Sequence, residues 1–226
     1  MASSRRDVRQ KKKKAGKAKS LRIIASILII IGVGIVGYFG YEQYMVRHQQ
    51  AKLREAYDAS AGFSHIDQLE QKPGEVFITE WQPMRLIIPS IDVDLIAVGG
   101  GDVFDHALLD QGPTHFQMSD LPNTERGNVA FAGHRAGRWN FFLDIDKLDD
   151  GDEIYLDVDG YRFIYLVEWV TVTDKYDWDP IDPTDYPAIT LQTCEPVGVP
   201  NPDWRLFVRG RLDEVVYIPV ETPDAN

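Results

Sequence analysis

Cysteine is nearly absent from this chain of 226 residues, and the one present, Cys194, has no partner for an internal disulfide. Basic charge is scarce outside the N-terminus. Residues 1–22 hold ten Lys and Arg and one acid, a charge of +9, so residues 23–226 carry −20 because the whole chain carries −11. Such an acidic body repels phosphate, and we expect it to have no nucleic-acid partner.

Other signatures are missing as well. The stretch VGGGD (98–102) lacks the lysine of a P-loop, so we interpret it as a flexible loop. The sequence contains no internal repeat, and its only low-complexity stretch is the basic N-terminus. Hydrophobic residues make up 44% and charged residues 26%, which indicates a globular protein, and the length favours one medium domain with additions.

One long apolar run is present, IIASILIIIGVGIVGYFGY, from Ile23 to Tyr41. As a helix it would span about 28 Å, close to the hydrocarbon thickness of a bilayer. Basic flanks stay on the cytoplasmic side, so residues 1–22 are expected to form a cytoplasmic tail and the acidic body to lie outside. The alternative is a cleaved signal peptide, but its apolar region is shorter, and GYEQYMVRHQQA offers no A-x-A-like cleavage site. We therefore predict a retained single-pass anchor over residues 23–41.

The rest of the chain divides by composition. Residues 42–58 lack Gly and Pro and favour a helix that continues the membrane helix as a stalk, whereas residues 59–83 contain KPGE and indicate a linker. The stalk and linker thus cover residues 42–83. Residues 84–226 are expected to form one extracytoplasmic domain.

The pattern of this domain is mainly β. Its clearest element is a hairpin over 153–172 with Asp159-Gly160 as the turn. A helix is predicted over 138–152, because Phe141, Phe142, Ile145 and Leu148 share one face. Further strands are predicted over 84–98 (a pair interrupted by a Pro), 127–134, 188–194 and 204–212. Seven or eight strands in about 140 residues fit a small closed or partly open β-barrel.

Cys194 ends one of these strands. A lone cysteine is either a small buried hydrophobe or a nucleophile that needs a proton partner, and the residues alone leave both open. Among the five histidines, His134 stands where an apolar strand stops, at the place where a barrel presents side chains on its rim.

The other histidines are given passive roles. We interpret His48 and His65 as solvated residues of the stalk and linker, and His106 and His115 as structural residues of a loop.

A fixed positive charge comes after Cys194 in the chain. Arg205 begins the next strand, and with a period of two it shares a face with Arg209 and Arg211. If the two strands are antiparallel, Arg205 lies nearest the rim that carries Cys194. Its guanidinium keeps its charge, which suits stabilisation of an oxyanion.

Three motifs then occur in order: AGHR (132–135), TLQTCEP (190–196) and RLFVRG (205–210). Together with the membrane anchor, they resemble the sortases, membrane-anchored cysteine transpeptidases of mainly Gram-positive bacteria, over about residues 84–213. The residues of these motifs are most similar to those of sortase classes D and E. The resemblance implies an eight-stranded sortase-type β-barrel with short helices.

The resemblance also implies the chemistry. Cys194 would be the nucleophile, His134 the acid and base, and Arg205 the group that holds substrate and oxyanion. Thr193 would help to bind substrate or orient the site, or else be an ordinary β-branched strand residue. The substrate would be a secreted protein with a C-terminal LPxTG-like signal, and the acceptor an amine of the cell wall or of a pilin subunit.

The loop DKYDWDPIDPTDY (174–186) takes the position that shapes signal recognition in this family. Its five Asp offer hard ligands for Ca²⁺, but we favour a solvated acidic loop and expect no metal site and no cofactor.

Two other functions compete with the sortase interpretation. An L,D-transpeptidase-like cysteine enzyme would need a His close before the Cys, whereas His134 lies sixty residues upstream. A catalytically inactive sortase-like surface module would not need Cys194, His134 and Arg205 together.

Overall fold

The computed structural model describes residues 3–60, 74–137 and 140–218, with side chains from Leu21 onward. The chain divides into two compact units, Met1–Met45 and Val46–Asn226. A single helix, α1, covers Ser3–Ser60, so the prediction that the apolar helix continues through residues 42–58 is confirmed. Within it, Leu21–Ala59 holds a stretch long and apolar enough to cross a membrane, although a signal sequence meets the same criterion.

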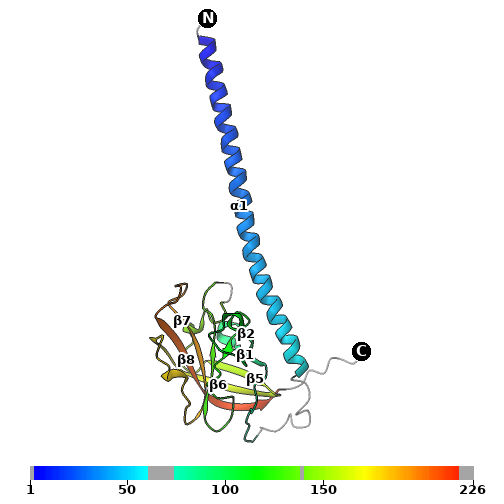
Figure 1. Ribbon diagram of the computed structural model, residues 1–226, viewed down its shortest axis with the longest axis vertical. Helices are drawn as coiled ribbons and strands as arrows, with labels where there is room; N and C mark the ends of the chain where they lie inside the picture. Colours follow the sequence, from blue (N-terminus) through cyan, green and yellow to red (C-terminus); the bar gives the residue numbers. More distant parts are fainter. Residues whose placement is uncertain (1–2, 61–73, 138–139, 219–226) are drawn as a thin grey trace, which may run out of the picture. The chain divides into compact units, whose positions relative to one another are not determined.

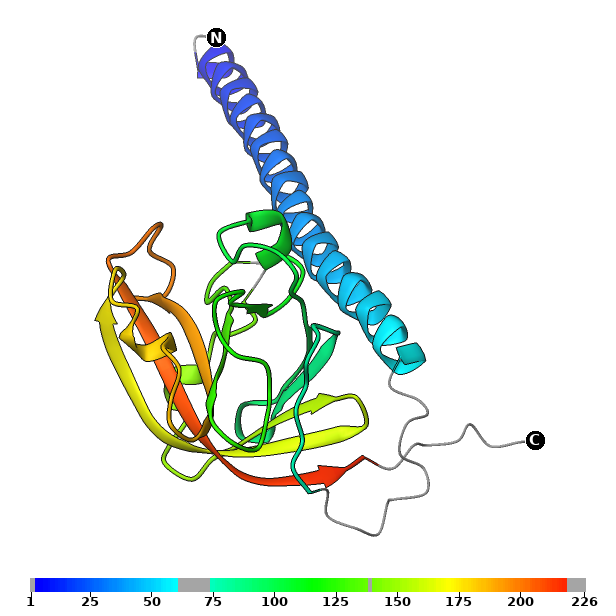
Figure 2. The same ribbon diagram turned by 60° about the horizontal axis from the view of Figure 1, so that its bottom comes forward.

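The second unit is built around one eight-stranded sheet in the order β2-β1-β5-β6-β8-β7-β4-β3. A bridge between Val98 and Thr114 joins its two ends, so the sheet closes almost completely into a barrel, as Figures 1 and 2 show. The strands are β1 (Met84–Ile88), β2 (Val93–Ala97), β3 (Thr114–His115), β4 (Gly127–Ala132), β5 (Glu153–Val158), β6 (Tyr161–Asp174), β7 (Pro187–Glu195) and β8 (Trp204–Tyr217). The mainly β prediction with eight strands is confirmed.

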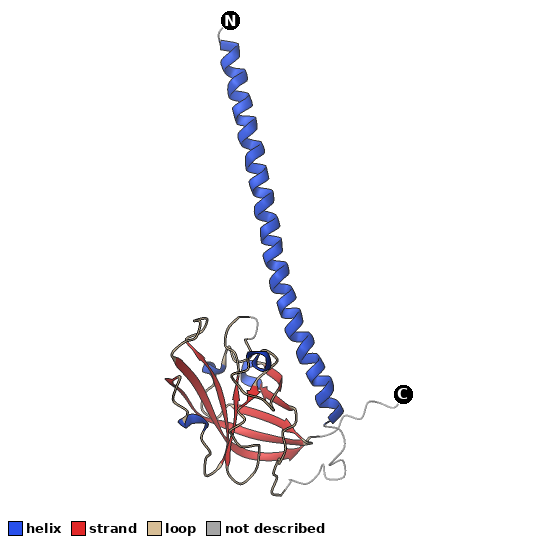
Figure 3. Ribbon diagram, in the orientation of Figure 1, coloured by secondary structure: helices blue, strands red, loops and turns tan. Residues whose placement is uncertain are grey.

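Apart from the end of α1, the described residues of this unit form only short helical pieces, which lie between the strands (Figure 3). They are the α-helix α2 (His106–Leu109) and the 3-10 turns η2 (Pro89–Ile91), η3 (Ile145–Lys147) and η4 (Asp179–Ile181). The hairpin of β5 and β6 turns at Asp159 and Gly160, both with positive φ, as its sequence predicts. The barrel interior is filled by apolar side chains from all around the sheet, with Leu86, Phe131, Leu156, Phe163 and Leu191 fully buried.

The helix predicted over 138–152 is wrong. Residues 138–139 lie outside the described residues, and residues 140–152 form a series of turns with the short η3. The apolar face was predicted correctly, since Phe141, Phe142, Ile145 and Leu148 are all buried. Tertiary partners, however, take the backbone groups that an α-helix needs: the Phe142 N–H donates to His134 O, and Leu143 O accepts from the Arg135 guanidinium.

The barrel also begins earlier than Met84. Val76 and Ile78 are buried in the core, and Phe77 forms a bridge with Asn123. The last part of the predicted linker therefore belongs to the barrel domain. Residues 61–73 of the linker lie outside the described residues.

Candidate active site

Cys194 and Arg205 face each other across two antiparallel strands. The pairing of β7 with β8 sets Cys194 directly opposite Arg205, and Thr190 opposite Arg209. Opposite residues of an antiparallel pair bring their side chains within about 5 Å at Cβ on the same face of the sheet. The two strands are antiparallel, which is the condition under which the sequence places Arg205 nearest the rim that carries Cys194.

His134 reaches the same end of the sheet from another direction. β4 runs parallel to β7, with Ala132 opposite Gln192, and the Gly133 N–H continues the ladder to Gln192 O at 3.0 Å. His134 and Cys194 thus stand at two strand ends that lie side by side. The Phe142 ring packs against Gly133, and a Cβ there would lie 2.5 Å from that ring, so the residue before His134 has to be glycine.

Thr193 stabilises this junction. Its side chain is buried, and its hydroxyl donates to Gly133 O at 2.7 Å. It thereby ties the strand that carries Cys194 to the turn that carries His134. Its predicted part in substrate binding stays a prediction.

Two residues of the α2 region contact His134. Asp110 Oδ1 lies 3.1 Å from His134 Nε2, and the His106 ring stacks on the His134 ring at 6.4 Å between centroids. Burial lowers the pKa of His134 below its ordinary value, Asp110 opposes this by favouring the charged form, and His106 adds to the lowering. At neutral pH the imidazole is therefore mostly neutral and able to accept a proton.

Arg205 is held by its own loop. Its Nη1 donates to Pro202 O at 2.8 Å and to Trp204 O at 2.9 Å. These bonds fix one edge of the guanidinium, which lines the cleft together with Cys194 and His134.

These side chains open into a cleft of about 720 Å³. Part of its lining is apolar and aromatic, because Phe104 and Trp178 meet edge to face at 5.9 Å and Phe116 packs against Trp178. A second hollow of about 530 Å³ shares these rings and extends to Met118. Cys194, His134 and Arg205 thus share one cleft with several aromatic rings, and such a cleft suits an extended peptide with apolar side chains.

The loop that carries Trp178 is anchored from inside the protein. Arg209 is buried and donates to Thr190 Oγ1 at 2.8 Å and to Pro180 O, which also accepts from Asn128 Nδ2. The three arginines of β8 therefore have different roles: Arg205 lines the cleft, Arg209 holds the loop 174–186, and the exposed Arg211 pairs with Glu168 at 2.6 Å.

Arg135, the residue after His134, is also buried. Its guanidinium pairs with Glu195, the residue after Cys194, and with Asp146 at 2.8 Å, and donates to Cys194 O at 3.4 Å. It thus links the two turns that carry the nucleophile and the imidazole.

Replacing Arg135 by leucine should lower the melting midpoint of the full chain by about 5 °C. Its carboxylate partners Asp146 and Glu195 are partly exposed, so the loss is that of charged hydrogen bonds, about 1.5–3 kcal/mol, and 1 kcal/mol corresponds to about 2–4 °C in a domain of this size. Thermal unfolding followed by tryptophan fluorescence measures it. Arg126→Leu, the same substitution at an exposed site, is the control and should shift the midpoint by no more than about 2 °C. Equal shifts in both variants would contradict the role given to Arg135.

Sequence reasoning missed Asp110, Arg135 and the active-site position of His106, which it interpreted as structural. One signal was available, since His106 and Asp110 are four residues apart and face the same side of one helical turn. His115 is structural as expected, stacked on Trp81 at 5.0 Å. Across the described ranges, no three His, Cys, Asp or Glu side chains gather as a metal ion requires.

Known proteins of one family are similar to this chain. The family model described as "Sortase domain" matches residues 86–213. Sortase SrtE1 of Streptomyces coelicolor is 27% identical over 231 residues, 93% of this chain and 62% of that protein, so the chain spans less than two thirds of this relative. Sortase A of Bacillus anthracis is 26% identical over 208 residues, 87% of this chain and 96% of that protein.

Solved structures give the same result. Sortase E1 from Streptomyces coelicolor with a tripeptide in its active site is 27% identical, with a TM-score of 0.55 over 63% of this chain and 94% of that chain. A Clostridium perfringens sortase D5 transpeptidase, 24% identical, shares the fold with a TM-score of 0.57 over 74% of this chain and 99% of that one. The match to SrtE1 agrees with the similarity of the motif sequences to sortase classes D and E.

Proposed function

Since this chain belongs to the sortase family, with the family model covering more than half of it, we propose that it is a cysteine transpeptidase. It would join the C-terminal sorting signal of a secreted protein to an amine. One observation carries the proposal: Cys194 lies directly opposite Arg205, and both line one cleft with His134.

The first half of the reaction forms a thioester. Cys194 Sγ attacks the carbonyl carbon of the Thr in an LPxTG-like signal, and its proton passes to the neutral imidazole of His134. The guanidinium of Arg205 stabilises the oxyanion of the tetrahedral intermediate. When the carbon–nitrogen bond breaks, His134 gives its proton to the leaving amine, and the acyl group stays on sulfur.

The second half regenerates the thiol. An incoming amine attacks the thioester carbonyl and gives a proton to His134, and the proton returns to Cys194 as the carbon–sulfur bond breaks. The acceptor is an amine of a cell-wall peptide or of a pilin lysine. Overall one amide is exchanged for another, so the chemistry needs no cofactor.

The rest of the cleft suits the donor. Aromatic rings from Phe104, Phe116 and Trp178 would pack against the apolar side chain of an extended signal peptide. Thr193, beside the nucleophile, would contribute to substrate binding. The basic residues 1–22 would remain in the cytoplasm, and the catalytic unit would meet its substrates outside the cell membrane.

Product masses test the proposal. Incubating the full chain in detergent micelles with LPxTG-like and LAxTG-like peptides and candidate amines should give a product in which the residues after Thr are replaced by the amine. The absence of any peptide–amine adduct, with the protein folded, would contradict it.

A thiol probe distinguishes the proposal from an inactive surface module. Cys194 of the folded chain should react with a methanethiosulfonate reagent, because the thiol lines the cleft. A thiol that resists the reagent would favour the inactive module.

A further inference from the structure

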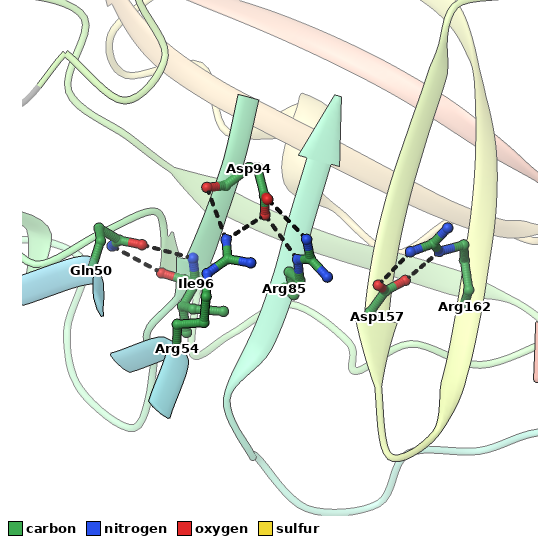
Figure 4. A network of polar contacts seen from close by, with 7 residues as sticks. All are labelled: Gln50, Arg54, Arg85, Asp94, Ile96, Asp157 and Arg162. Atoms are coloured by element: carbon green, nitrogen blue, oxygen red, sulfur yellow. Dashed lines mark hydrogen bonds and ion pairs between the residues drawn. The ribbon is translucent and has the colours of Figure 1, made fainter. Parts of the chain in front are cut away.

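The part of α1 after Met45 belongs to the same compact unit as the barrel. Val46, Gln50, Arg54 and Tyr57 recur at helical spacing on one face, where Tyr57 is buried and Val46 packs against the core. The sequence interpreted these residues as a stalk. The structure instead packs them on the barrel beside β1 and β2, as the close view in Figure 4 shows for Gln50 and Arg54.

Gln50 acts as a substitute strand partner. β2 ends the strand order of the sheet, so the outward N–H and C=O of Ile96 need partners from elsewhere. Gln50 Oε1 accepts the Ile96 N–H at 2.8 Å, and its Nε2 donates to Ile96 O at 3.3 Å (Figure 4). The same Nε2 also donates to Gln111 O at 2.7 Å. Both amide hydrogens of Gln50 are thus used, one on the sheet edge and one on the chain segment that leaves α2.

A second contact holds the helix one turn further on. Asp94 accepts Arg54 Nη2 at 2.6 Å and Arg85 Nε at 2.8 Å (Figure 4). Hydrogen bonding from Arg85, joined by that from Arg54, lowers the pKa of Asp94 to about 2. These bonds fasten the helix to β1 and β2 without touching the segment after α2.

That segment begins at Asp110, which contacts the imidazole of His134. Asp110, whose carboxylate lies 3.1 Å from His134 Nε2, is followed by Gln111 and Gly112. A Cβ on Gly112 would lie 2.6 Å from Ile96 O and 2.9 Å from Gln50 Nε2. The sheet edge and the Gln50 amide therefore both lie close against one side of the backbone after Asp110, and they leave no room there for a side chain.

We propose that Gln50 is a positioning residue of the active site: by bonding Ile96 and Gln111 together, it sets the place of Asp110 and thereby the ionisation of His134. The juxtamembrane helix then contributes, through Gln50, to the geometry of the active site. The proposal rests on the proposed function only in that His134 is the acid and base of the reaction, and its test observes the imidazole directly.

Several groups surround His134. His106 and Asp110 contact it from the α2 region, Cys194 and Arg205 share its cleft from β7 and β8, and Lys175 and Tyr176 line that cleft from the loop after β6. Of the contributions to its pKa, Asp110 alone raises it, against burial and His106. Displacing Asp110 must therefore lower the pKa of His134 further.

The test uses the full chain in detergent micelles and titrates the His134 imidazole by NMR. Gln50→Ala, and Gln50→Met, which fills the same space without polar atoms, should lower the pKa of His134 in the same direction as Asp110→Asn. Adding Gln50→Ala to Asp110→Asn should lower it no further, since both act through one contact. Acyl transfer at neutral pH should fall about two- to tenfold, the equivalent of one hydrogen bond.

Arg54→Ala is the matched control, because it loosens the same helix from the same edge without losing a bond to Gln111. It should lower the unfolding midpoint and leave the pKa of His134 unchanged, and the exposed Lys52→Ala should change neither. An unchanged pKa in both Gln50 variants, or an equal shift in Arg54→Ala, would overturn the proposal. A chain that couples no peptide to any amine would refute the proposed function instead, and the titration would still decide the role of Gln50.

Discussion

Cys194→Ala is expected to abolish acyl transfer, with a loss of at least about 10⁴-fold, because the thioester has no other atom on which to form. The thiol is half-buried at the end of β7, so its loss should cost under about 1 kcal/mol of unfolding free energy. The fold, the cleft and the contacts of His134 should remain.

Product mass with a donor peptide and an amine measures the first effect, and chemical denaturation followed by tryptophan fluorescence measures the second. Lys52→Ala serves as an active control. Coupling of peptide to amine at an undiminished rate by a folded Cys194→Ala chain would refute the covalent mechanism.

Arg205→Ala should lower the rate of acyl transfer by about 10²–10³-fold, the usual cost of removing one oxyanion donor. Its position explains the size of the effect, because it lies opposite Cys194 and its guanidinium lines the cleft. Arg205→Lys keeps the charge but loses the planar donor geometry, so it should recover only part of the rate.

Two arginines further along β8 are the controls, with rates compared per folded molecule. Arg211→Ala, at an exposed site, should leave both rate and stability nearly unchanged. Arg209→Ala should lower the unfolding midpoint by removing a buried anchor of the loop 174–186, with a much smaller loss of rate than Arg205→Ala. Equal losses of rate at Arg205 and Arg209 would mean that the oxyanion role belongs to another residue.

Hydrophobic periodicity and the positions of turn and helix-breaking residues were sufficient to predict those elements that depend only on local sequence. The hairpin at Asp159 and Gly160 follows from two alternating strands and a turn dipeptide, and the continuous α1 follows from a run without helix breakers. The helix expected over 138–152 shows the limit of this reasoning. Its apolar spacing was real, but Arg135 bonds Leu143 O and His134 O accepts the Phe142 N–H, and neither competitor is visible within the segment.

The catalytic candidates divide in the same way. Cys194, His134 and Arg205 were identified from strand ends and motif letters, because the chemistry of a side chain and its place on a strand are local properties. Asp110 and Arg135 were missed, because their importance depends on His134, Glu195 and Asp146, which approach them only when separate strands and turns pack together.

The sequence by itself therefore determined the apolar helix, the strands, the lone thiol and the residue types available to it. Tertiary structure alone decided that residues expected to form a stalk pack on the barrel. It also decided that Gln50 hydrogen-bonds the edge of β2 and that the carboxylate of Asp110 contacts the imidazole of His134. The physical reason is that a periodic pattern specifies which face of an element is buried. Which distant backbone group or carboxylate that face meets depends on how the barrel closes.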